Sequence, residues 1–447
     1  MQRGKNPPNQ KGVIVMKRKL LALLLALSMT LSLCTGVWAA DAVPGEEGVT
    51  SGVTDSDGVQ AEYPEAPTSD QERWKVLSEN PVDQEFLKAI NVFAQRTGAK
   101  LLSKKGGCYS PLSLYYALAL VSEGARGQTA EELYSLLGED ADDMGTQCAN
   151  LYRRLYTANG PSTLLIANSL WLDDEVLGLP VHFREEYLNK AKEDYYASVF
   201  KVDFSDKATG EKMGNWVREN TKGMLNFSLE PSDEQMMAIL NTVYFKSRWQ
   251  RPFQKADTSK AKFTLANGKK KKIKFMHCKE EGSYYKGKNY TAAYRTMKSG
   301  RVTFYLPDKG VDVHKLLKQK DLFSIPASKY KDCDLKWSVP KFKSENKWDL
   351  IPSMKKLGVN LAFTNDADFS ALSDTPATIS AIEQGTRFDM NEKGAEAAAY
   401  TYIAVDKATA VMPQKRKTVK MNLNRPFLYT ITSEDGVVLF MGIYDGK

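Results

Sequence analysis

The stretch that decides the fold lies near the C-terminal end and reads Asn391-Glu392-Lys393-Gly394-Ala395-Glu396-Ala397-Ala398-Ala399-Tyr400-Thr401. Its alanines have high helix propensity, so an alanine-rich helix is one interpretation. As a strand, the stretch has a period of two, and one side carries only Ala395, Ala397, Ala399 and Thr401. Side chains this small can slide against a packed core without overpacking it. The pattern therefore favours a segment that can be added to an existing sheet.

Two features around this stretch fit such an addition. Gly394 lacks a Cβ atom and can act as a hinge. No proline occurs in residues 392–412, so every amide there could join a strand ladder. Glu396, Ala398 and Tyr400 would lie on the solvent side of the added strand.

Elsewhere the chain predicts helices first and strands later, which is the α+β pattern. Ser110-Pro111 begins a helix that ends at Gly124, and Thr129 with Glu132 forms a capping box for the next helix. Residues 241–245 form a short apolar strand. Phe427 to Ile431 alternates before a turn at 433–436 and the apolar return 437–441, which predicts a hairpin.

The N-terminal part predicts export. After Met16, which we take as the true start, three basic residues precede the apolar run 20–33 and the sequence Val37-Trp38-Ala39. This is the pattern of a secretory signal peptide over residues 1–39, and the apolar run is too short for a membrane span of about 20 residues. A lipid anchor on Cys34 is an alternative, although Leu33 stands where a small residue is expected. We expect a secreted or extracellular protein, with association to the cell surface left open.

Residues 40–78 are acidic and poor in bulky apolar side chains, so we expect a disordered linker there. From residue 79 to 447 the chain is continuously patterned, with no linker and no internal repeat. One large domain follows from that pattern.

Composition excludes several classes of function. The chain has 447 residues and a net charge of +8, and the basic leader accounts for six of its 62 Lys and Arg. The remainder is nearly neutral, which argues against nucleic acid as a partner. Three histidines and four scattered cysteines outside the leader supply neither a zinc site nor a disulfide framework, and the redox state of the cysteines stays open. No catalytic motif has its required context, so the chain is not expected to be an enzyme.

A basic run, Lys269–Lys272 with Lys274, follows Asn267-Gly268. The Asn-Gly pair predicts a hairpin turn. A solvated turn is the simpler interpretation, and a site for a polyanion is the alternative.

Further motifs along the body carry a family resemblance. They are Ser110-Pro111-Leu112-Ser113, Asn215-Trp216-Val217, Phe245-Lys246-x-x-Trp249, Tyr305-Leu306-Pro307-Asp308, Pro340-Lys341-Phe342, Asn424-Arg425-Pro426-Phe427 and Leu439-Phe440-Met441-Gly442. Together with the 391–401 stretch, and in the same order over about residues 79–445, they resemble the inhibitory serpins, with a bacterial secreted member as the expectation.

The resemblance implies a serpin fold: an α+β domain of three β-sheets and about nine helices with an exposed reactive-centre loop. It implies a metastable monomer that inhibits serine proteases as a suicide substrate and needs no metal or cofactor. In serpins the protease cleaves the loop, the loop inserts into the central sheet, and the protease is trapped as an acyl-enzyme. The hinge of that loop is then formed by Glu392, Gly394, Ala395, Glu396, Ala397, Ala398, Ala399 and Thr401.

The resemblance also locates the reactive bond, about sixteen residues beyond Glu392, because the inserted strand must span the sheet at about 3.3 Å per residue. This count gives Ala408-Thr409 and an elastase-like target. Lys407 is the nearest competitor, and a count back from Asn424 gives Lys415-Arg416; either lysine would suit a trypsin-like target. A non-inhibitory binding or surface protein remains the alternative function.

A polar network that controls sheet opening in this family corresponds to Ser110, Ser113, Asn241 and Gln384. Gln384 stands at a position where serpins often have histidine. It could still form a hydrogen bond with Asn241 across the strands.

Overall fold

The computed structural model describes residues 58–104, 106–138, 141–158, 162–226, 228–395 and 416–446. The expected leader over 1–39 and the first part of the expected linker lie outside these residues. So do the hinge positions Glu396 to Thr401, the expected bond Ala408-Thr409, and the competing lysines Lys407 and Lys415.

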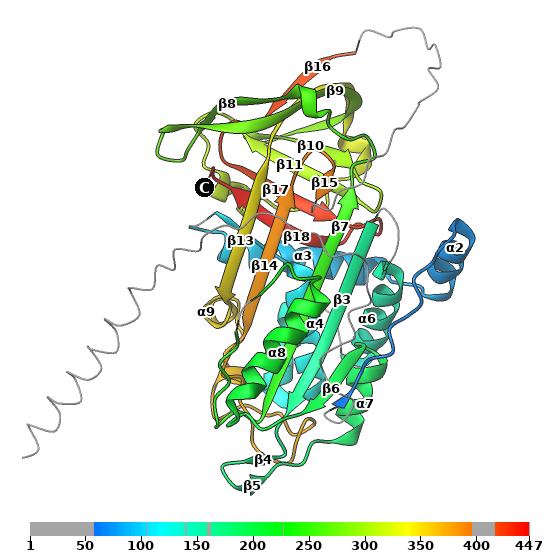
Figure 1. The fold of residues 1–447 in the computed structure, drawn as a ribbon, viewed down its shortest axis with the longest axis vertical. Coiled ribbons are helices and arrows are strands. Elements are labelled where there is room, and N and C mark those ends of the chain that lie inside the picture. The colour runs from blue at the N-terminus through cyan, green and yellow to red at the C-terminus, as the bar shows by residue number, and fades with distance from the viewer. Residues whose placement is uncertain are drawn as a thin grey trace, which may run out of the picture. The chain divides into compact units, whose positions relative to one another are not determined.

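The central sheet, sheet A, has seven strands and runs lengthwise through the molecule (Figure 1). Its strands, in spatial order, are β1 (Gly58–Val59), β6 (Ala197–Lys201), β3 (Ser162–Leu172), β7 (Met237–Arg248), β15 (Gly394–Ala395), β14 (Glu383–Met390) and β13 (Phe342–Asp349). The longest pairing joins β3 to β7 over eleven positions, from Ser162↔Ser247 to Leu172↔Met237. The two residues of β15 lie between β7 and β14 and are antiparallel to both.

The second sheet, sheet B, has nine strands. They are β16 (Thr418–Asn422), β12 (Lys331–Pro340), β9 (Lys270–Gly287), β10 (Tyr290–Thr296), β11 (Arg301–Pro307), β17 (Phe427–Thr432), β18 (Val438–Tyr444) and β2 (Gly107–Tyr109), with β8 (Thr258–Thr264) paired to β9. β17 and β18 form the expected hairpin, and every residue of both strands is buried. A third, two-stranded sheet joins β4 (Glu175–Val176) to β5 (Leu179–Pro180).

Helices flank the sheets. They are α2 (Asp70–Glu79), α3 (Gln84–Leu101), α4 (Pro111–Gly124), α5 (Gly127–Leu137), α6 (Ala141–Leu155), α7 (Glu185–Glu193), α8 (Lys207–Asn220) and α9 (Ile351–Lys355), with short 3₁₀ turns η1 (Lys255–Asp257), η2 (Val313–Lys318), η3 (Ala327–Lys329) and η4 (Leu361–Phe363). The expected α+β architecture with three sheets is confirmed. No helix among the residues that the structure describes combines the length and apolar character needed to cross a membrane.

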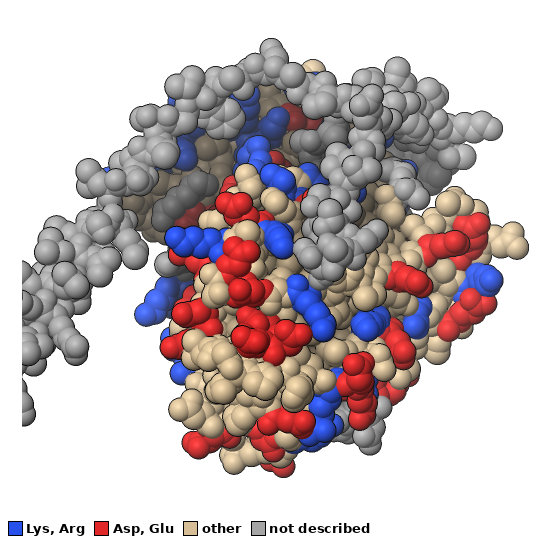
Figure 2. Space-filling view, turned by 60° about the horizontal axis from the view of Figure 1, so that its bottom comes forward, with Lys and Arg blue, Asp and Glu red and all other residues tan. Residues whose placement is uncertain are grey.

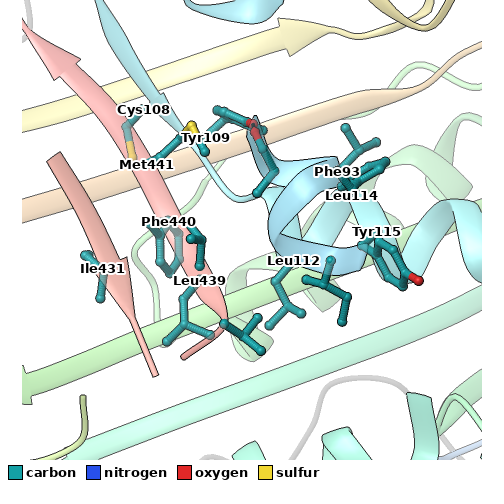
Figure 3. Packing of buried hydrophobic residues seen from close by; sticks show 14 of the residues in the cluster. Phe93, Cys108, Tyr109, Leu112, Leu114, Tyr115, Ile431, Leu439, Phe440 and Met441 are labelled. Atoms are coloured by element: carbon teal, nitrogen blue, oxygen red, sulfur yellow. Dashed lines mark hydrogen bonds between the residues drawn. The ribbon is translucent and has the colours of Figure 1, made fainter. Parts of the chain in front are cut away.

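Helix α4 begins and ends as its sequence predicts. The Ser110 hydroxyl accepts the Ser113 N–H at 3.1 Å, Pro111 occupies the first turn, and Gly124 is the last residue. The helix is buried almost all round, and Leu112 points toward Leu439 of β18 (Figure 3). Its Tyr115 ring meets Phe93 of α3 edge-on at 5.2 Å. Helix α4 therefore forms the centre of the main core, beneath sheet A.

The opposite face of sheet A is covered by α8 (Figure 1). Trp216 and Val217 of α8 pack with Trp171 of β3 and Ala238 of β7. Ile239 and Val243 of β7 pack instead against the main core on the α4 side. Successive β7 side chains therefore alternate between the main core and the α8 core. Any strand added beside β7 will have the same two faces.

The predicted capping box of the next helix is wrong. Helix α5 begins at Gly127, two residues before Thr129, with Arg126 as its cap residue. The Thr129 hydroxyl instead accepts the Asp368 N–H at 3.0 Å, and the Glu132 carboxylate accepts the N–H groups of Asn360 and Leu361 at 2.6 and 2.9 Å. Both polar side chains hold a distant loop against the helix.

The expected disordered linker is wrong for its second half. Gly58 and Val59 pair with Phe200 and Val199 at the edge of sheet A, and residues 70–79 form α2. Tyr63 stacks on Tyr156 with ring centroids 5.9 Å apart, and burial raises its pKa to about 12. Low hydrophobicity predicted disorder, but an open strand edge and a neighbouring aromatic ring provide contacts that the segment does not contain itself.

Tyr63→Ala is expected to lower the free energy of unfolding by about 2 kcal/mol, because it removes a partly buried ring that stacks on Tyr156. Urea denaturation followed by tryptophan fluorescence measures this loss. The exposed neighbour Glu65, changed to alanine, is the control and should cost less than about 0.5 kcal/mol. Equal effects of the two changes would mean that the segment does not contribute to stability.

Candidate functional site

A tight turn brings the hinge into sheet A. The Asn391 N–H donates to the Gly394 carbonyl at 3.0 Å, and the Gly394 N–H returns to the Asn391 carbonyl at 3.3 Å. The Lys393 N–H donates to the Asn391 side chain at 2.9 Å. This turn reverses the chain at the end of β14, so that β15 runs back between β14 and β7.

Gly394 is required by close approach of the backbone. A Cβ atom at this position would lie 2.1 Å from the Ser247 carbonyl oxygen and 2.8 Å from the Arg248 Cα. Real Cβ contacts are much longer, so a side chain would push β15 out of the sheet. The next residue, Ala395, is 1% exposed and its side chain joins the main core.

Trp249 holds the turn from the β7 side. Its backbone N–H donates to the Lys393 carbonyl at 2.9 Å, and its indole N–H donates to the Asn391 carbonyl at 3.0 Å. The ring itself is 1% exposed. Two carbonyls of the turn are therefore tied to one buried side chain and its backbone.

Glu392 anchors the other side of the turn. Its carboxylate accepts the Thr258 hydroxyl at 2.9 Å and pairs with the Lys341 ammonium at 2.8 Å. Burial acts to raise the pKa of this carboxyl, but the hydrogen bonds from Lys341 and Thr258 outweigh it, and the pKa lies below its ordinary value. The carboxylate is therefore ionised at neutral pH and links the hinge to β8 and to the segment before β13.

A pH dependence follows from Glu392. Because its pKa is lower in the folded than in the unfolded chain, where it is about 4.3, the ion pair contributes stability at neutral pH. That contribution is lost as the pH falls through the folded pKa. We expect Glu392→Gln to have a lower Tm than the wild type at pH 7, with a difference that narrows as the pH falls below the unfolded pKa of about 4.3. Glu211→Gln, at an exposed position, is the control and should show no such convergence.

A buried cation lies beneath this anchor. Arg295 of β10 is 4% exposed and donates to the Glu280 carboxylate at 2.8 and 2.9 Å and to the Arg251 carbonyl at 2.8 Å. Its guanidinium lies 3.9 Å from the Phe253 ring centroid and 5.1 Å from that of Trp249. The arginine therefore supports the tryptophan that holds the turn, a role that the sequence analysis missed.

Below Ala395 a narrow cavity of about 20 Å³ separates β7 from β14. Its lining includes residues 241–245 of β7, residues 385–388 of β14, and Ser110 and Ser113 of α4 with its cap. The space admits about one water molecule. Among the described strands, β7 and β14 pair with β15 but form no ladder with each other below the hinge.

The four residues of the expected polar network form two separate sets of hydrogen bonds, one at the start of α4 and one between β7 and β3. The Gln384 side chain accepts the Ser110 N–H and donates to the Ser110 carbonyl, both at 2.9 Å. The Ser110 hydroxyl also donates to the Leu439 carbonyl at 2.7 Å and accepts the Ser113 N–H. Ser110, Ser113 and Gln384 therefore lie together at the start of α4.

The expected hydrogen bond between Gln384 and Asn241 is absent from these contacts. Asn241 instead donates to Asn168, its cross-strand neighbour on β3. Because β7 and β14 are not paired with each other at this level among the described strands, Gln384 bonds to Ser110 at the helix cap. The Asn241 Oδ1 and the Thr242 hydroxyl are left buried without a hydrogen-bond partner at the cavity.

Fold and hinge together define a protein whose central sheet holds the two residues of β15 between β7 and β14. A family model described as Serpin (serine protease inhibitor) matches residues 88–445. The chain is 29% identical to Iripin-1 from Ixodes ricinus over 361 residues, which is 75% of this chain and 87% of Iripin-1. Among solved structures, the thermophilic serpin tengpin in its native state is similar with a TM-score of 0.73, 27% identity, and coverage of 87% of this chain and 98% of tengpin.

The chain belongs to the serpin family, whose members are mostly inhibitors of serine proteases and not catalytic enzymes. The family also contains non-inhibitory members. Thyroxine-binding globulin in its complex with thyroxine shares the fold with a TM-score of 0.66 at 24% identity, over 81% of this chain and 98% of that one. Membership alone therefore does not assign inhibition to this chain.

Proposed function

We propose that this protein is a secreted, irreversible inhibitor of serine proteases that traps its target by inserting its cleaved loop between β7 and β14. The observation that carries the proposal is the position of β15. Its two residues are already paired with both strands, whereas the facing edges of β7 and β14 form no ladder with each other among the described strands. A strand that continued from Ala395 would satisfy those edges, and its backbone hydrogen bonds would stabilise the inserted state.

The register of β15 predicts the partners of every inserted residue. Ala395 lies opposite Ser247 on one side and Met390 on the other. In antiparallel continuation, Ala397 would meet Phe245 and Phe388, two buried rings of the main core. A small residue is the only kind that fits between them, which supports insertion of this sequence.

The same register would bring Thr401 between Asn241 and Gln384. The Asn241 Oδ1 is buried without a partner, and a threonine hydroxyl is a suitable donor to it. Insertion would thus satisfy a polar atom that is unsatisfied beforehand. Asn241 and Gln384, two of the four residues expected to control sheet opening, would then contact the inserted strand from its two sides.

The length of β7 supports the expected reactive bond. β7 begins at Met237, which would lie opposite Val405 in the continued register. Three more residues, about 10 Å of extended chain, lead from Val405 to Ala408, so the bond Ala408-Thr409 would reach the end of the sheet. A small residue before the bond favours an elastase-like protease. Cleavage after Lys407 or Lys415 would instead mean a trypsin-like target.

Incubation of the full chain with pancreatic elastase tests the proposal. We expect a complex that survives SDS electrophoresis and a released peptide that begins at Thr409. A complex formed with trypsin and not with elastase would still support inhibition, but it would move the reactive bond to Lys407 or Lys415. Cleavage by every serine protease tried, with no complex and no rise in Tm, would overturn inhibition in favour of a non-inhibitory binding role.

Export forms part of the proposal and rests on the leader pattern of residues 16–39. N-terminal sequencing of the protein recovered from culture medium should begin at Ala40. A protein that remains inside the producing cells with its leader intact would contradict export.

A further inference from the structure

The β8–β9 hairpin is a rigid ribbon with one buried face. β8 pairs with β9 over seven positions, from Thr258↔Met276 to Thr264↔Lys270. The turn is closed by the Leu265 N–H, which donates to the Lys269 carbonyl at 2.8 Å, and Gly268 has the positive φ of 78° that the turn needs. Phe263 and Phe275 are 0% and 1% exposed on the buried face.

The opposite face carries an array of lysines. Lys260 lies directly opposite Lys274, Lys262 lies opposite Lys272, and Lys270 continues the row toward the turn. All five side chains are exposed. None of the five forms an ion pair with a carboxylate in the part of the chain that the structure describes, whereas Lys286 and Lys341 elsewhere are paired with Asp308 and Glu392.

Fold stability does not account for this array. Like charges directly opposite each other on a strand pair destabilise the sheet, and two such pairs are adjacent here. Elsewhere the surface is mixed: on the face shown in Figure 2, Asp and Glu side chains lie among the lysines and arginines. A bound anion would attract each lysine and so offset the repulsion between them.

The arrangement also restricts the class of ligand. Lysines on one strand repeat about every 7 Å and face their partners across about 5 Å, which suits a linear polymer lying along the ribbon. The face contains no arginine, the residue that binds discrete phosphates with two parallel hydrogen bonds. It also contains no aromatic side chain on which a nucleic-acid base could stack.

We propose that the exposed face of the β8–β9 hairpin, formed by Lys260, Lys262, Lys270, Lys272 and Lys274, is a binding site for a linear anionic polysaccharide carrying sulfate or carboxylate groups. The hairpin lies at the upper left of Figure 1, with one strand edge paired to the rest of sheet B. The site does not depend on loop insertion, so its test is independent of whether the protein inhibits proteases.

The experiment measures binding of the full chain to heparin, a sulfated polysaccharide, over a range of salt concentrations. The test variant is Lys260→Gln/Lys262→Gln/Lys272→Gln. Its control is Lys315→Gln/Lys318→Gln/Lys320→Gln, which removes the same charge from exposed lysines of η2 and its flank. We expect the test variant to lose about 10- to 100-fold in affinity at low salt and to reduce the salt slope by about 2 to 3, with the control within about 2-fold of the wild type.

A second readout separates the site from a folding defect. Because the test variant removes like-charge pairs, its Tm should equal or exceed that of the wild type. Equal losses of affinity in both variants would overturn the proposal, because heparin binding would then depend on the net charge of the protein and not on the hairpin. Absence of heparin binding by the wild type, or tighter hairpin-dependent binding of polyphosphate or a thymidine oligonucleotide than of heparin, would overturn the polysaccharide assignment.

Discussion

Ala397→Glu is expected to turn the proposed inhibitor into a substrate. In the register that β15 begins, residue 397 would enter between Phe245 and Phe388, both in the main core. A carboxylate buried there without a partner costs about 3 kcal/mol or more. Insertion would slow by more than about 100-fold, and the protease would hydrolyse its acyl-enzyme first. The measurement is the fraction of elastase in SDS-stable complex, alongside the rate of loop cleavage.

Ala398→Glu is the matched control, because it makes the same change one residue further on. This position would face the α8 side of sheet A, opposite Arg387, whose side chain is 33% exposed. The added carboxylate would then have solvent and an opposite charge nearby. Complex formation should stay within a few-fold of the wild type. Equal loss in both variants would contradict the proposed register, and retained complexes with Ala397→Glu would contradict the assignment of the inward face.

Glu392→Lys is expected to release the hinge. The change replaces a carboxylate that accepts the Thr258 hydroxyl and lies 2.8 Å from the Lys341 ammonium by a second ammonium group, which repels Lys341. Breaking a buried pair costs about 3–5 kcal/mol; because Lys341 is 34% exposed, we expect about 2–3 kcal/mol here. With β15 displaced, the edges of β7 and β14 would be open to strands of other chains. The measurements are Tm and the proportion of oligomers after mild heating.

The charge swap Glu392→Lys/Lys341→Glu tests this interpretation. A double-mutant cycle isolates the interaction between the two side chains. If the ion pair holds the hinge, the double variant should recover at least half of the lost stability and should stay monomeric on heating. A double variant as unstable as the sum of its single changes would mean that Glu392 acts through Thr258 or the backbone alone.

The special role of Gly394 could be predicted from the sequence because its physics is local. Gly394 has no side chain, and the alternation of small residues after it holds for any strand. Helix α4 was predictable for the same reason, since Ser110, Pro111 and Gly124 act on the turns in which they lie. The β17–β18 hairpin likewise follows from alternation and its turn. In each case the residues that specify the element are neighbours in the chain.

The partners of polar side chains could not be predicted in this way. Gln384 and Asn241 lie on strands that the sequence suggested would meet, yet the cavity between the strands leaves Gln384 with Ser110 and Asn241 with Asn168. Thr129 has the spacing of a helix cap but holds a loop 239 residues away. A polar side chain takes the nearest suitable partner in space, and only the packing of elements determines which one that is.

The sequence by itself predicted which segment could be added to the sheet, because the size of each side chain in residues 394–401 is independent of its surroundings. It also determined the identity of the helices and strands that carry strong local signals. Only the tertiary structure decided what holds the turn before that segment, namely Trp249 and Lys341 with the buried Arg295 against Trp249. It also decided that Gly58 and Val59 pair with β6 at the far edge of sheet A. These contacts join residues far apart in the chain, so they form and stabilise the protein only after the two sheets and their helices have packed together.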